Sequence, residues 1–288
     1  MFIDMHVHPA FYEPINQDSE LEELRHNTLD IHKNGTAPLE HIFNQMKCAG
    51  LDYLCLLPED YRTQQGGKVL VSNEEISQLV NMAPDKFIGF AGVDPFAEDA
   101  AEELEKAFAE LKLSGLKLHP GKGHFYPTDE RMMPLYDICE KYEKPIIFHS
   151  GMSWEPDTLT KYCRPEMFEE LAAARPKLKI CLAHFGWPWC RETAMLMLKY
   201  TNVYTDTGAL YFDNAKEFYT QMLTRDVPMT WIDRSLRHQG MFGSNNPRFE
   251  QIRMAHAIKE LGFRESTLDL ICGENAIEFL GGIPNRKA

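Results

Sequence analysis

Short apolar runs alternate with amphipathic segments along most of the chain. Continuous apolar runs bounded by Pro or Gly are typical of parallel strands that are buried on both faces. Eight strands are predicted, at residues 2–8, 52–57, 87–93, 115–119, 145–149, 178–184, 203–206 and 241–245. The segments between them place apolar residues at helical spacing. This alternation of strand and helix implies a parallel sheet.

Helices are expected between and after these strands. They are predicted at residues 39–49, 73–82, 97–112, 130–142, 167–174, 187–200, 215–223, 247–261 and 266–280. Gly50 directly follows the first of them, as a helix-terminating glycine does. Eight βα units within 288 residues fit a closed (β/α)₈ TIM barrel better than an open, doubly wound sheet. We therefore predict a single domain over residues 1–288.

Residues 10–38 interrupt this alternation. The segment is polar, irregular in pattern and contains the acidic run 18–23. It is long for a mere connection, which favours an irregular lid or binding loop after the first strand. No Gly-x-Gly-x-x-Gly follows the first strand, and no Gly-x₄-Gly-Lys-Ser/Thr occurs. The usual sequence signals of a nucleotide-phosphate site are therefore absent.

Polar side chains, chiefly histidine, mark the carboxyl ends of the predicted strands. In a (β/α)₈ barrel these ends meet at one face, where the chemistry of the fold gathers. Five of the 11 histidines fall there, whereas random placement would scatter them through helices and loops. The residues at this rim are His6, His8, Glu59, Asp94, Lys117, His119, His149, His184, Asp206 and Asn245.

His6 and His8 end the first strand two positions apart. Side chains alternate between the faces of a strand, so both imidazoles project the same way and could share a metal ion. A short strand with two incidental histidines is the plainer alternative. It is disfavoured by the further histidines at later strand ends.

Composition limits the partners and the compartment. A formal net charge of −13 argues against nucleic acid or an anionic membrane surface as a partner, because both need basic patches. A small anionic substrate stays compatible, since a metal can dominate the field in a cleft. The seven cysteines form no Cys-x-x-Cys pair, and most of them are expected to be buried thiols of a reducing compartment. With no signal peptide or membrane-length apolar run, we expect a cytoplasmic protein.

Several motifs, taken together and in order, resemble those of the amidohydrolase superfamily. They are His6-x-His8, Gly115-Leu-Lys-Leu-His-Pro120, Phe148-His-Ser-Gly151, Ala183-His-Phe-Gly186, Tyr204-Thr-Asp-Thr207 and Phe242-Gly-Ser-Asn-Asn-Pro247. Phe125-Tyr-Pro-x-Asp129 and Asn275-Ala-Ile-x-Phe-Leu280 resemble its amidohydrolase-2 branch, which includes aromatic-acid decarboxylases as well as hydrolases. The resemblance runs from residue 2 to about residue 282.

The resemblance implies that His6, His8 and His149 bind one divalent metal ion and that His184 faces the substrate beside it. Neutral imidazoles suit Zn²⁺ best, with Mn²⁺ as an alternative. An open position on such an ion lets a bound water ionise near neutral pH. The plainer alternatives are a His149 bonded to backbone and a His184 that only holds the loop at residues 185–189.

Lys117, His119, Trp154 and Trp187 are expected to contact the substrate. In binuclear relatives a lysine on the fourth strand is carboxylated and bridges two metals. The branch resembled here is mostly mononuclear, so we expect an uncarboxylated Lys117 that makes hydrogen bonds. The two tryptophans follow the fifth and sixth strands, where they could wall a pocket for a flat substrate or merely pack loops over the rim.

Asn245 departs from the resembled family, which has aspartate at this position of the last strand. That carboxylate normally contacts the metal and, in hydrolases, takes the proton of the attacking water. An amide is no base at neutral pH and offers only a neutral oxygen. Three explanations stay open: a deliberate alteration that traps a substrate complex, another base such as His184, or lost hydrolytic chemistry. Asp206 is expected to position other groups.

We predict a metal-dependent hydrolase that acts on a small-molecule amide, ester or lactone. His184 would move a proton, and Asn245 would contact the ion and orient the water. One alternative is a metal-dependent decarboxylase of an aromatic or unsaturated carboxylic acid. Another is a catalytically silent metal-binding or ligand-binding barrel. The substrate, the metal and the oligomeric state, a homo-oligomer included, are left open by the sequence.

Overall fold

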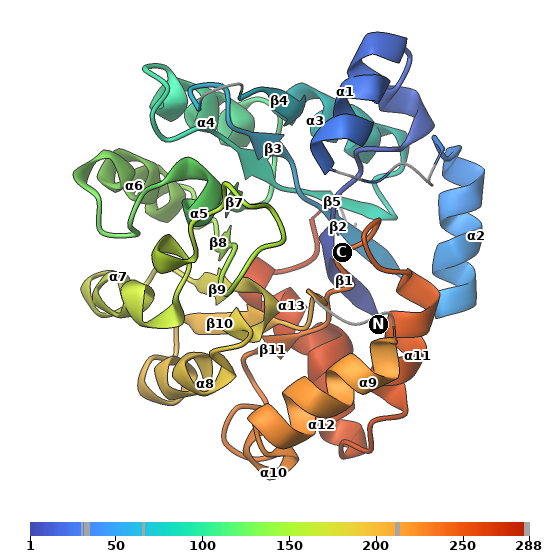
Figure 1. Ribbon diagram of the computed structural model, residues 1–288, viewed down its shortest axis with the longest axis vertical. Helices are drawn as coiled ribbons and strands as arrows, with labels where there is room; N and C mark the ends of the chain where they lie inside the picture. The colour runs from blue at the N-terminus through green and yellow to red at the C-terminus, as the bar shows by residue number, and fades with distance from the viewer. Residues whose placement is uncertain (30, 32–34, 65–66, 211–213, 285–288) are drawn as a thin grey trace.

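Eight parallel strands form a barrel surrounded by helices (Figure 1). The computed structural model describes residues 1–29, 31, 35–64, 67–210 and 214–284. The barrel strands are β1 Ile3–Val7, β2 Tyr53–Leu56, β5 Phe87–Gly89 with β6 Ala91–Gly92, β7 Leu116–Leu118, β8 Ile146–Phe148, β9 Ile180–Leu182, β10 Val203–Asp206 and β11 Gly240–Met241. Each strand pairs in parallel with the next. The predicted (β/α)₈ TIM barrel is confirmed.

The third barrel strand is interrupted at Phe90, which separates β5 from β6. The N–H of Phe90 donates to Leu56 O at 3.0 Å, and the N–H of Ala91 donates to Gly115 O at 2.7 Å. The strand therefore bonds β2 up to Phe90 and β7 from Ala91 onward, and the barrel remains continuous across the interruption.

The barrel closes between its first and last strands. The N–H of Met5 donates to Phe242 O, and the N–H of Asn245 donates to His6 O, both at 2.9 Å. Val7 and Asn246 form a parallel bridge beyond them. Residues from the two ends of the chain, His6 and Asn245, are thereby held side by side at the carboxyl ends of the strands.

The helices lie outside the barrel, as the alternating pattern predicts (Figure 1). The longer ones are α2 Leu39–Ala49, α3 Asn73–Met82, α4 Ala100–Ala109, α6 Met133–Lys141, α8 Cys190–Lys199 and α11 Gln251–Lys259. The shorter ones are α5 Pro120–Gly123, α7 Glu169–Ala174, α9 Ala215–Thr220, α10 Met229–Ile232, α12 Glu265–Asp269 and α13 Asn275–Leu280. Two helices begin and end at the predicted residues, α2 and α3.

Local end signals account for the bounds of α2 and α3. Gly50 has a φ of 74° and donates its N–H to Lys47 O and Met46 O, which ends α2. At α3, the Ser72 hydroxyl accepts from the N–H of Glu75, and the Glu75 carboxylate accepts from the N–H of Ser72. This reciprocal capping box satisfies two donors at the start of the helix.

The barrel interior is packed by large side chains. Phe90, Ile147, Cys181 and Tyr204 are buried there in one cluster. A Cβ atom on Gly115 would lie 2.3 Å from the Phe90 ring, closer than atoms can approach. Gly115 therefore leaves the room that Phe90 fills, and the site above rests on a filled floor.

The prediction that residues 10–38 are irregular is wrong. A helix, α1 Ser19–Leu29, occupies much of the segment. Its Arg25 is fully buried and donates to Leu70 O at 2.7 Å and to Glu75 at 2.6 Å. The helix has leucine at only three of its 11 positions, so its apolar periodicity is too weak to predict it. A lid role for the segment stays a prediction, and residues 30 and 32–34 lie outside the described part of the chain.

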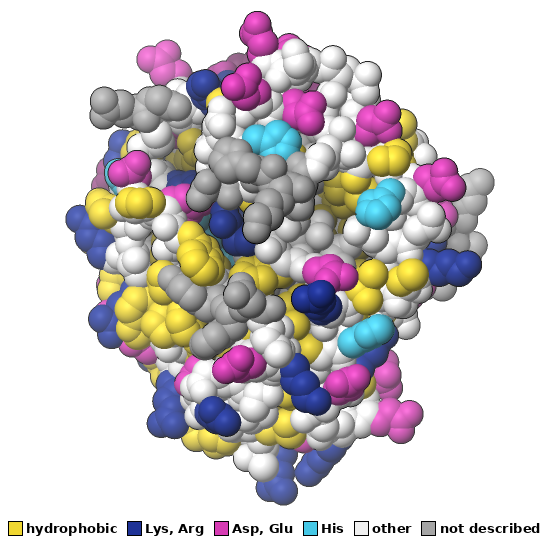
Figure 2. Space-filling view, turned by 45° about the vertical axis from the view of Figure 1, so that its right-hand side comes forward, with side chains coloured by type: hydrophobic (Ala, Val, Ile, Leu, Met, Phe, Trp, Pro, Cys, Tyr) yellow, Lys and Arg dark blue, Asp and Glu magenta, His cyan; other side chains and the backbone are white. Residues whose placement is uncertain are grey.

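The sequence pattern also did not predict a small antiparallel hairpin that follows β2. Its strands are β3 Glu59–Asp60 and β4 Val69–Val71. On the face shown in Figure 2, acidic and basic side chains are interspersed. No helix in the described residues has the length and apolar character needed to cross a bilayer. Six of the seven thiols are buried, and Cys48 is exposed.

Candidate active site

A small pocket, partly open to solvent, lies at the carboxyl ends of the strands. Its lining comes from segments that follow β1, β2, β7, β8, β9, β10 and β11, as expected for the fold. Polar side chains dominate this lining: His6, His8, Glu59, Tyr61, Lys117, His119, Lys122, His149, Ser153, Glu155, His184, Asn245 and Arg248. The predicted rim residues except Asp94 and Asp206 therefore line one pocket.

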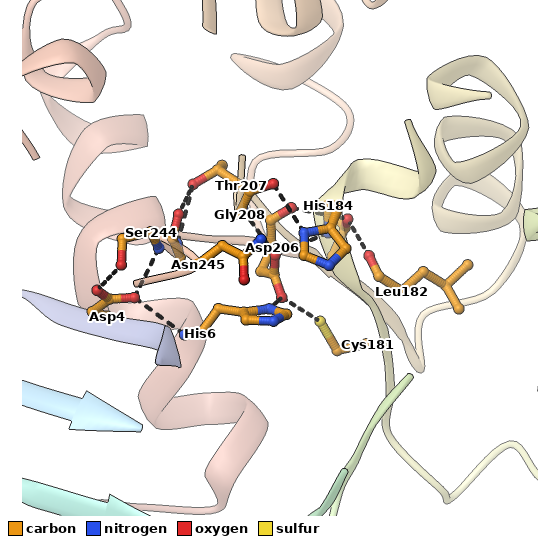
Figure 3. A network of polar contacts seen from close by, with 12 residues as sticks. Asp4, His6, Cys181, Leu182, His184, Asp206, Thr207, Gly208, Ser244 and Asn245 are labelled. Carbon is orange, nitrogen blue, oxygen red and sulfur yellow. Dashed lines mark hydrogen bonds and ion pairs between the residues drawn. The ribbon is translucent and has the colours of Figure 1, made fainter. Parts of the chain in front are cut away.

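Asp206, at the end of β10, organises the inner part of the pocket (Figure 3). Its Oδ2 lies 2.8 Å from His6 Nδ1, and its Oδ1 accepts from the N–H of His184 and of Gly208, both at 2.9 Å. The side chain is fully buried. Both carboxylate oxygens are therefore committed to orienting neighbours, which agrees with the positioning role expected for Asp206.

The imidazoles of the inner pocket are fixed through one nitrogen each. A carboxylate or carbonyl can only accept, so the nitrogen facing it carries the hydrogen of the neutral ring. That nitrogen is Nδ1 in His6, Nε2 in His149, 3.1 Å from Met152 O, and Nδ1 in His184, 3.0 Å from Gly208 O. The other nitrogen of each of these rings keeps its lone pair for a ligand.

His8 and His119 complete the set. His8 Nδ1 lies 3.2 Å from Glu59 Oε1 but has no well-aligned hydrogen bond among the described residues. His119 caps α5 by accepting from the N–H of Lys122 at 3.3 Å, and its ring stacks on His149 with centroids 3.8 Å apart. The His119 ring therefore supports the His149 ring, in addition to lining the pocket.

Burial keeps these imidazoles neutral. Desolvation lowers the pKa of His6, His119, His149 and His184 well below the ordinary value. It lowers the pKa of His8 to about 4, although Glu59 opposes the shift. Neutral imidazoles with free lone pairs are the form in which histidine binds metals.

Two groups of described residues bring three ligand atoms within 4.8 Å of one another: His6, His184 and Asp206, and His119, His149 and Cys163. The predicted ligands His6, His8 and His149 do not form such a close group by themselves. The ring centroids of His6 and His8 are 5.2 Å apart. The ring of His149 lies next to that of His184, with the centroids 4.9 Å apart. The predicted ligand assignment therefore stays a prediction.

Asn245 stands beside His6 in a strained backbone conformation, with a φ of 62° (Figure 3). Its Nδ2 donates to Ala209 O at 2.8 Å, which leaves the amide oxygen to meet a ligand. Asp4 holds this segment, because it accepts from the N–H and the hydroxyl of Ser244, at 2.9 and 2.6 Å. Sequence analysis overlooked Asp4, whose pKa burial raises to about 6.

Lys117 is the buried cation of the inner pocket. Its side chain is only 6% exposed, and its Nζ has no hydrogen-bond partner among the described residues. Desolvation lowers the pKa of this ammonium group, although the Asp206 charge opposes the shift. An unpartnered buried ammonium group is costly, so a ligand with negative charge is the expected partner.

Charged loop residues form the outer part of the pocket. Lys122 Nζ lies 3.3 Å from Glu59 and 3.2 Å from Glu155, and Arg248 lies 3.8 Å from Glu155. Burial opposes ionisation of Glu155, yet Lys122 above all holds its pKa at about 2. Lys122, Glu155 and Arg248 were not predicted from the sequence. Lys122 and Arg248 are basic residues shortly after a strand end, and this position could have indicated them.

The two tryptophans differ in position. Trp154 lines the pocket beside Glu155 and is 47% exposed. Trp187 was expected to wall the pocket too, but it packs on the apolar core, with its ring 6.3 Å from that of Phe218. Trp187 does not line the pocket, and the predicted substrate contacts of both tryptophans stay predictions.

The chain is similar to several known proteins. It is 23% identical over 305 residues to 2-amino-3-carboxymuconate-6-semialdehyde decarboxylase of Dictyostelium discoideum, across 93% of this chain and 77% of that protein. An uncharacterised TIM-barrel protein of Bordetella bronchiseptica superposes with a TM-score of 0.77 and 20% identity, across 97% and 98% of the two chains. For an aspartate-to-asparagine mutant of 5-carboxyvanillate decarboxylase of Novosphingobium aromaticivorans, with bound manganese and 3-methoxy-4-hydroxy-5-nitrobenzoic acid, the TM-score is 0.65, with 14% identity across 98% and 97%.

The fold and the pocket define a TIM barrel whose polar site is lined by neutral imidazoles. The amidohydrolase family matches residues 3–282 of the sequence, nearly the whole chain. The protein belongs to the amidohydrolase family, as its motifs indicated.

Proposed function

We propose that this protein is a metal-dependent decarboxylase of an aromatic or unsaturated carboxylic acid. Asn245 carries the proposal, because its amide stands at the pocket where the resembled family has an aspartate. An amide cannot take a proton from water, and decarboxylation needs no activated water. The Dictyostelium relative and the manganese-containing neighbour are decarboxylases by name, which supports the same direction. The hydrolase predicted from the sequence stays the alternative, because a probable 2-pyrone-4,6-dicarboxylic acid hydrolase is also among the structural neighbours.

The metal would be held by His6, His8 and His149, with the amide oxygen of Asn245 beside them. The tautomers of His6 and His149 support this assignment, because each has a lone pair left for a ligand. Asp206 remains an orienting group, since both its oxygens are occupied. A bound Zn²⁺ or Mn²⁺ supplies positive charge that holds substrate oxygens and stabilises charge developing on them.

Lys117 is the proposed proton donor. When the bond between the ring or vinyl carbon and the carboxylate carbon breaks, CO₂ leaves and the electron pair stays on that carbon, which then takes a proton. Neutral His184 carries its hydrogen on Nδ1 toward Gly208 O and has none to give from Nε2. The buried Lys117 ammonium has three, and its lowered pKa makes it a stronger acid than an ordinary lysine.

The test is CO₂ release from carboxyl-labelled acids by protein loaded with Mn²⁺ or Zn²⁺. A panel of hydroxybenzoates and muconate-type acids covers the proposed class. We expect labelled CO₂ together with one proton from water in the product. Incorporation of ¹⁸O from water into a cleaved ester, amide or lactone would instead establish hydrolysis.

Asn245→Asp separates the remaining alternatives. If the asparagine traps a hydrolase, the aspartate variant gains hydrolytic activity that the unaltered chain lacks. If the barrel is catalytically silent, neither protein turns over any acid or ester in the panel. CO₂ release by the unaltered chain contradicts both alternatives.

A further inference from the structure

A carboxylate of the protein lies between two cations at the outer end of the pocket. Glu155 Oε1 is 3.2 Å from Lys122 Nζ and 3.8 Å from Arg248 Nη2. Glu155 belongs to the loop after β8, whereas Lys122 belongs to α5 and Arg248 follows β11. Three loops that are distant in sequence thus meet at one carboxylate, and all three residues line the pocket.

Lys122 already has a second and more deeply buried counter-ion. Glu59 Oε2 lies 3.3 Å from Lys122 Nζ, and the side chain of Glu59 is 10% exposed against 28% for Glu155. Glu59 is anchored separately by the contact of its Oε1 with His8. Of the two acids around Lys122, Glu155 is therefore the more exposed, and its other carboxylate oxygen accepts from the hydroxyl of Ser153 on the same loop.

The charges of this group balance only while Glu155 is in place. Lys122 and Arg248 contribute two positive charges, and Glu59 and Glu155 contribute two negative ones. Moving the Glu155 side chain away would leave one excess positive charge at the pocket, which is the condition for binding one carboxylate. Replacing one carboxylate by another keeps the pairing of the cations, so the exchange avoids the cost of leaving a partly buried charge alone.

We propose that Lys122 and Arg248 form a subsite for a second acidic group of the substrate, and that Glu155 occupies this subsite in the free protein. The substrate class is then a dicarboxylic acid whose second carboxylate displaces Glu155. This inference rests on the proposed function, because it presumes that the first carboxylate enters the inner pocket near Lys117. It adds that the pocket selects diacids over monoacids at its outer end.

The subsite stays in place when Glu155 leaves. The Lys122 ammonium lies 4.9 Å from the centre of the Tyr61 ring, a cation–π contact that does not involve Glu155. Arg248 donates from Nη2 to Leu29 O at 3.3 Å. Both cations therefore keep contacts of their own and remain available to the incoming carboxylate.

The test compares binding of matched monoacids and diacids to manganese-loaded protein by calorimetry. The pairs are benzoate with isophthalate, and sorbate with muconate. In Glu155→Gln the competing carboxylate is gone, so diacids should bind roughly tenfold more tightly, about the contribution of one charge-assisted contact, while monoacids change less than about twofold. Lys122→Gln should weaken the binding of diacids selectively.

Glu192→Gln is the matched control, because Glu192 is a partly exposed glutamate paired with Arg164 and does not line the pocket. It should alter neither class of ligand, and thermal unfolding should show that all variants are folded. An unchanged preference in Glu155→Gln, equal gains for monoacids and diacids, or no binding of any diacid would overturn the subsite. CO₂ release by the unaltered protein tests the proposed function separately, so a shifted preference without CO₂ release would contradict only the decarboxylase.

Discussion

The inner and outer parts of the pocket differ in the charge of their side chains and in the elements that carry them. The inner wall, His6, His8, His149 and His184, consists of neutral rings on strand ends. The outer ring, Glu59, Lys122, Glu155 and Arg248, consists of full charges on loops, on the β3 hairpin and on the short helix α5. The inner rings hold lone pairs in fixed directions, whereas the outer charges are paired with one another.

This difference shows how one pocket can suit both a cation and an anion. Fixed lone pairs favour an ion that stays bound, since the Asp206 carboxylate orients the ring of His6 and backbone carbonyls orient those of His149 and His184. Mutually compensated charges favour exchange, because an incoming carboxylate can replace a resident one. A test of the contrast is whether changes to the two parts alter different ligands.

The largest expected effect is loss of the metal when an inner ring is removed. His149→Ala and His6→Ala each delete a proposed ligand, and metal affinity should fall more than about 100-fold, because even supporting residues of metal sites contribute 10-fold to 100-fold. Dialysis against a weak chelator followed by metal analysis measures the retained ion. Full occupancy in both variants would contradict the ligand assignment.

His256→Ala is a suitable control for these variants, since His256 lies on α11 and does not line the pocket. It should keep the metal content of the unaltered protein. Circular dichroism should report a folded barrel for all three variants, because the packed floor around Phe90 and Ile147 is untouched.

Lys117→Met should give the next largest effect, on turnover alone. The variant removes the proposed proton donor while filling a similar volume, so kcat for CO₂ release should fall by about 10²–10⁴. Metal content should be unchanged, which separates this residue from the ligands. Mass spectrometry of the intact protein should show no added CO₂ on Lys117, and a carboxylated lysine would favour a bridging role instead.

Most residues of the inner wall could be predicted from the sequence, for a physical reason. Parallel strands of a barrel end at a common face, so the residue that ends each strand has a known place once the strands are found. His6, His119, His149, His184 and Asn245 line the pocket in this way. Their hydrogen-bond partners could not be predicted, because the positions of carbonyls such as Met152 O depend on the conformation of each loop.

The outer ring could not be derived in the same manner. Glu155 and Arg248 lie on loops and Lys122 on the four-residue helix α5, where no periodicity fixes which side chains meet. Helix α1 was not predicted for a related reason. Its buried Arg25 makes polar contacts in place of the apolar contacts by which a helix is recognised in a sequence. Sequence pattern thus located what the strands position and missed what loop geometry and buried polar contacts position.

Asp206→Asn should have an intermediate effect, on the metal rather than on the fold of the barrel. The carboxylate now accepts from His6 Nδ1, whereas an amide that turns its NH₂ toward this nitrogen would force the hydrogen onto Nε2 and remove the lone pair there. Metal affinity should fall about 10-fold to 100-fold. An affinity equal to that of the unaltered protein would show that His6 needs no orienting carboxylate.

The smallest expected effect comes from Glu59→Gln, at the contact between the two parts of the pocket. Glu59 lies 3.2 Å from His8 and 3.3 Å from Lys122, so the variant weakens support for both. Metal affinity should fall by less than about 10-fold, below the effect of Asp206→Asn, because the contact of Glu59 with His8 is not a well-aligned hydrogen bond.

Glu59→Gln also tests the direction of the exchange at the outer ring. With Glu59 neutral, Lys122 attracts Glu155 and an incoming carboxylate more strongly to a similar degree, so the two gains offset each other and diacid binding should change less than about threefold. Glu155→Gln makes the same change in charge but should strengthen diacid binding. Calorimetry with isophthalate compares the two variants. Equal gains in the two variants would mean that diacids respond only to the net charge of the pocket, because only displacement of Glu155 gives the two glutamates effects of different size.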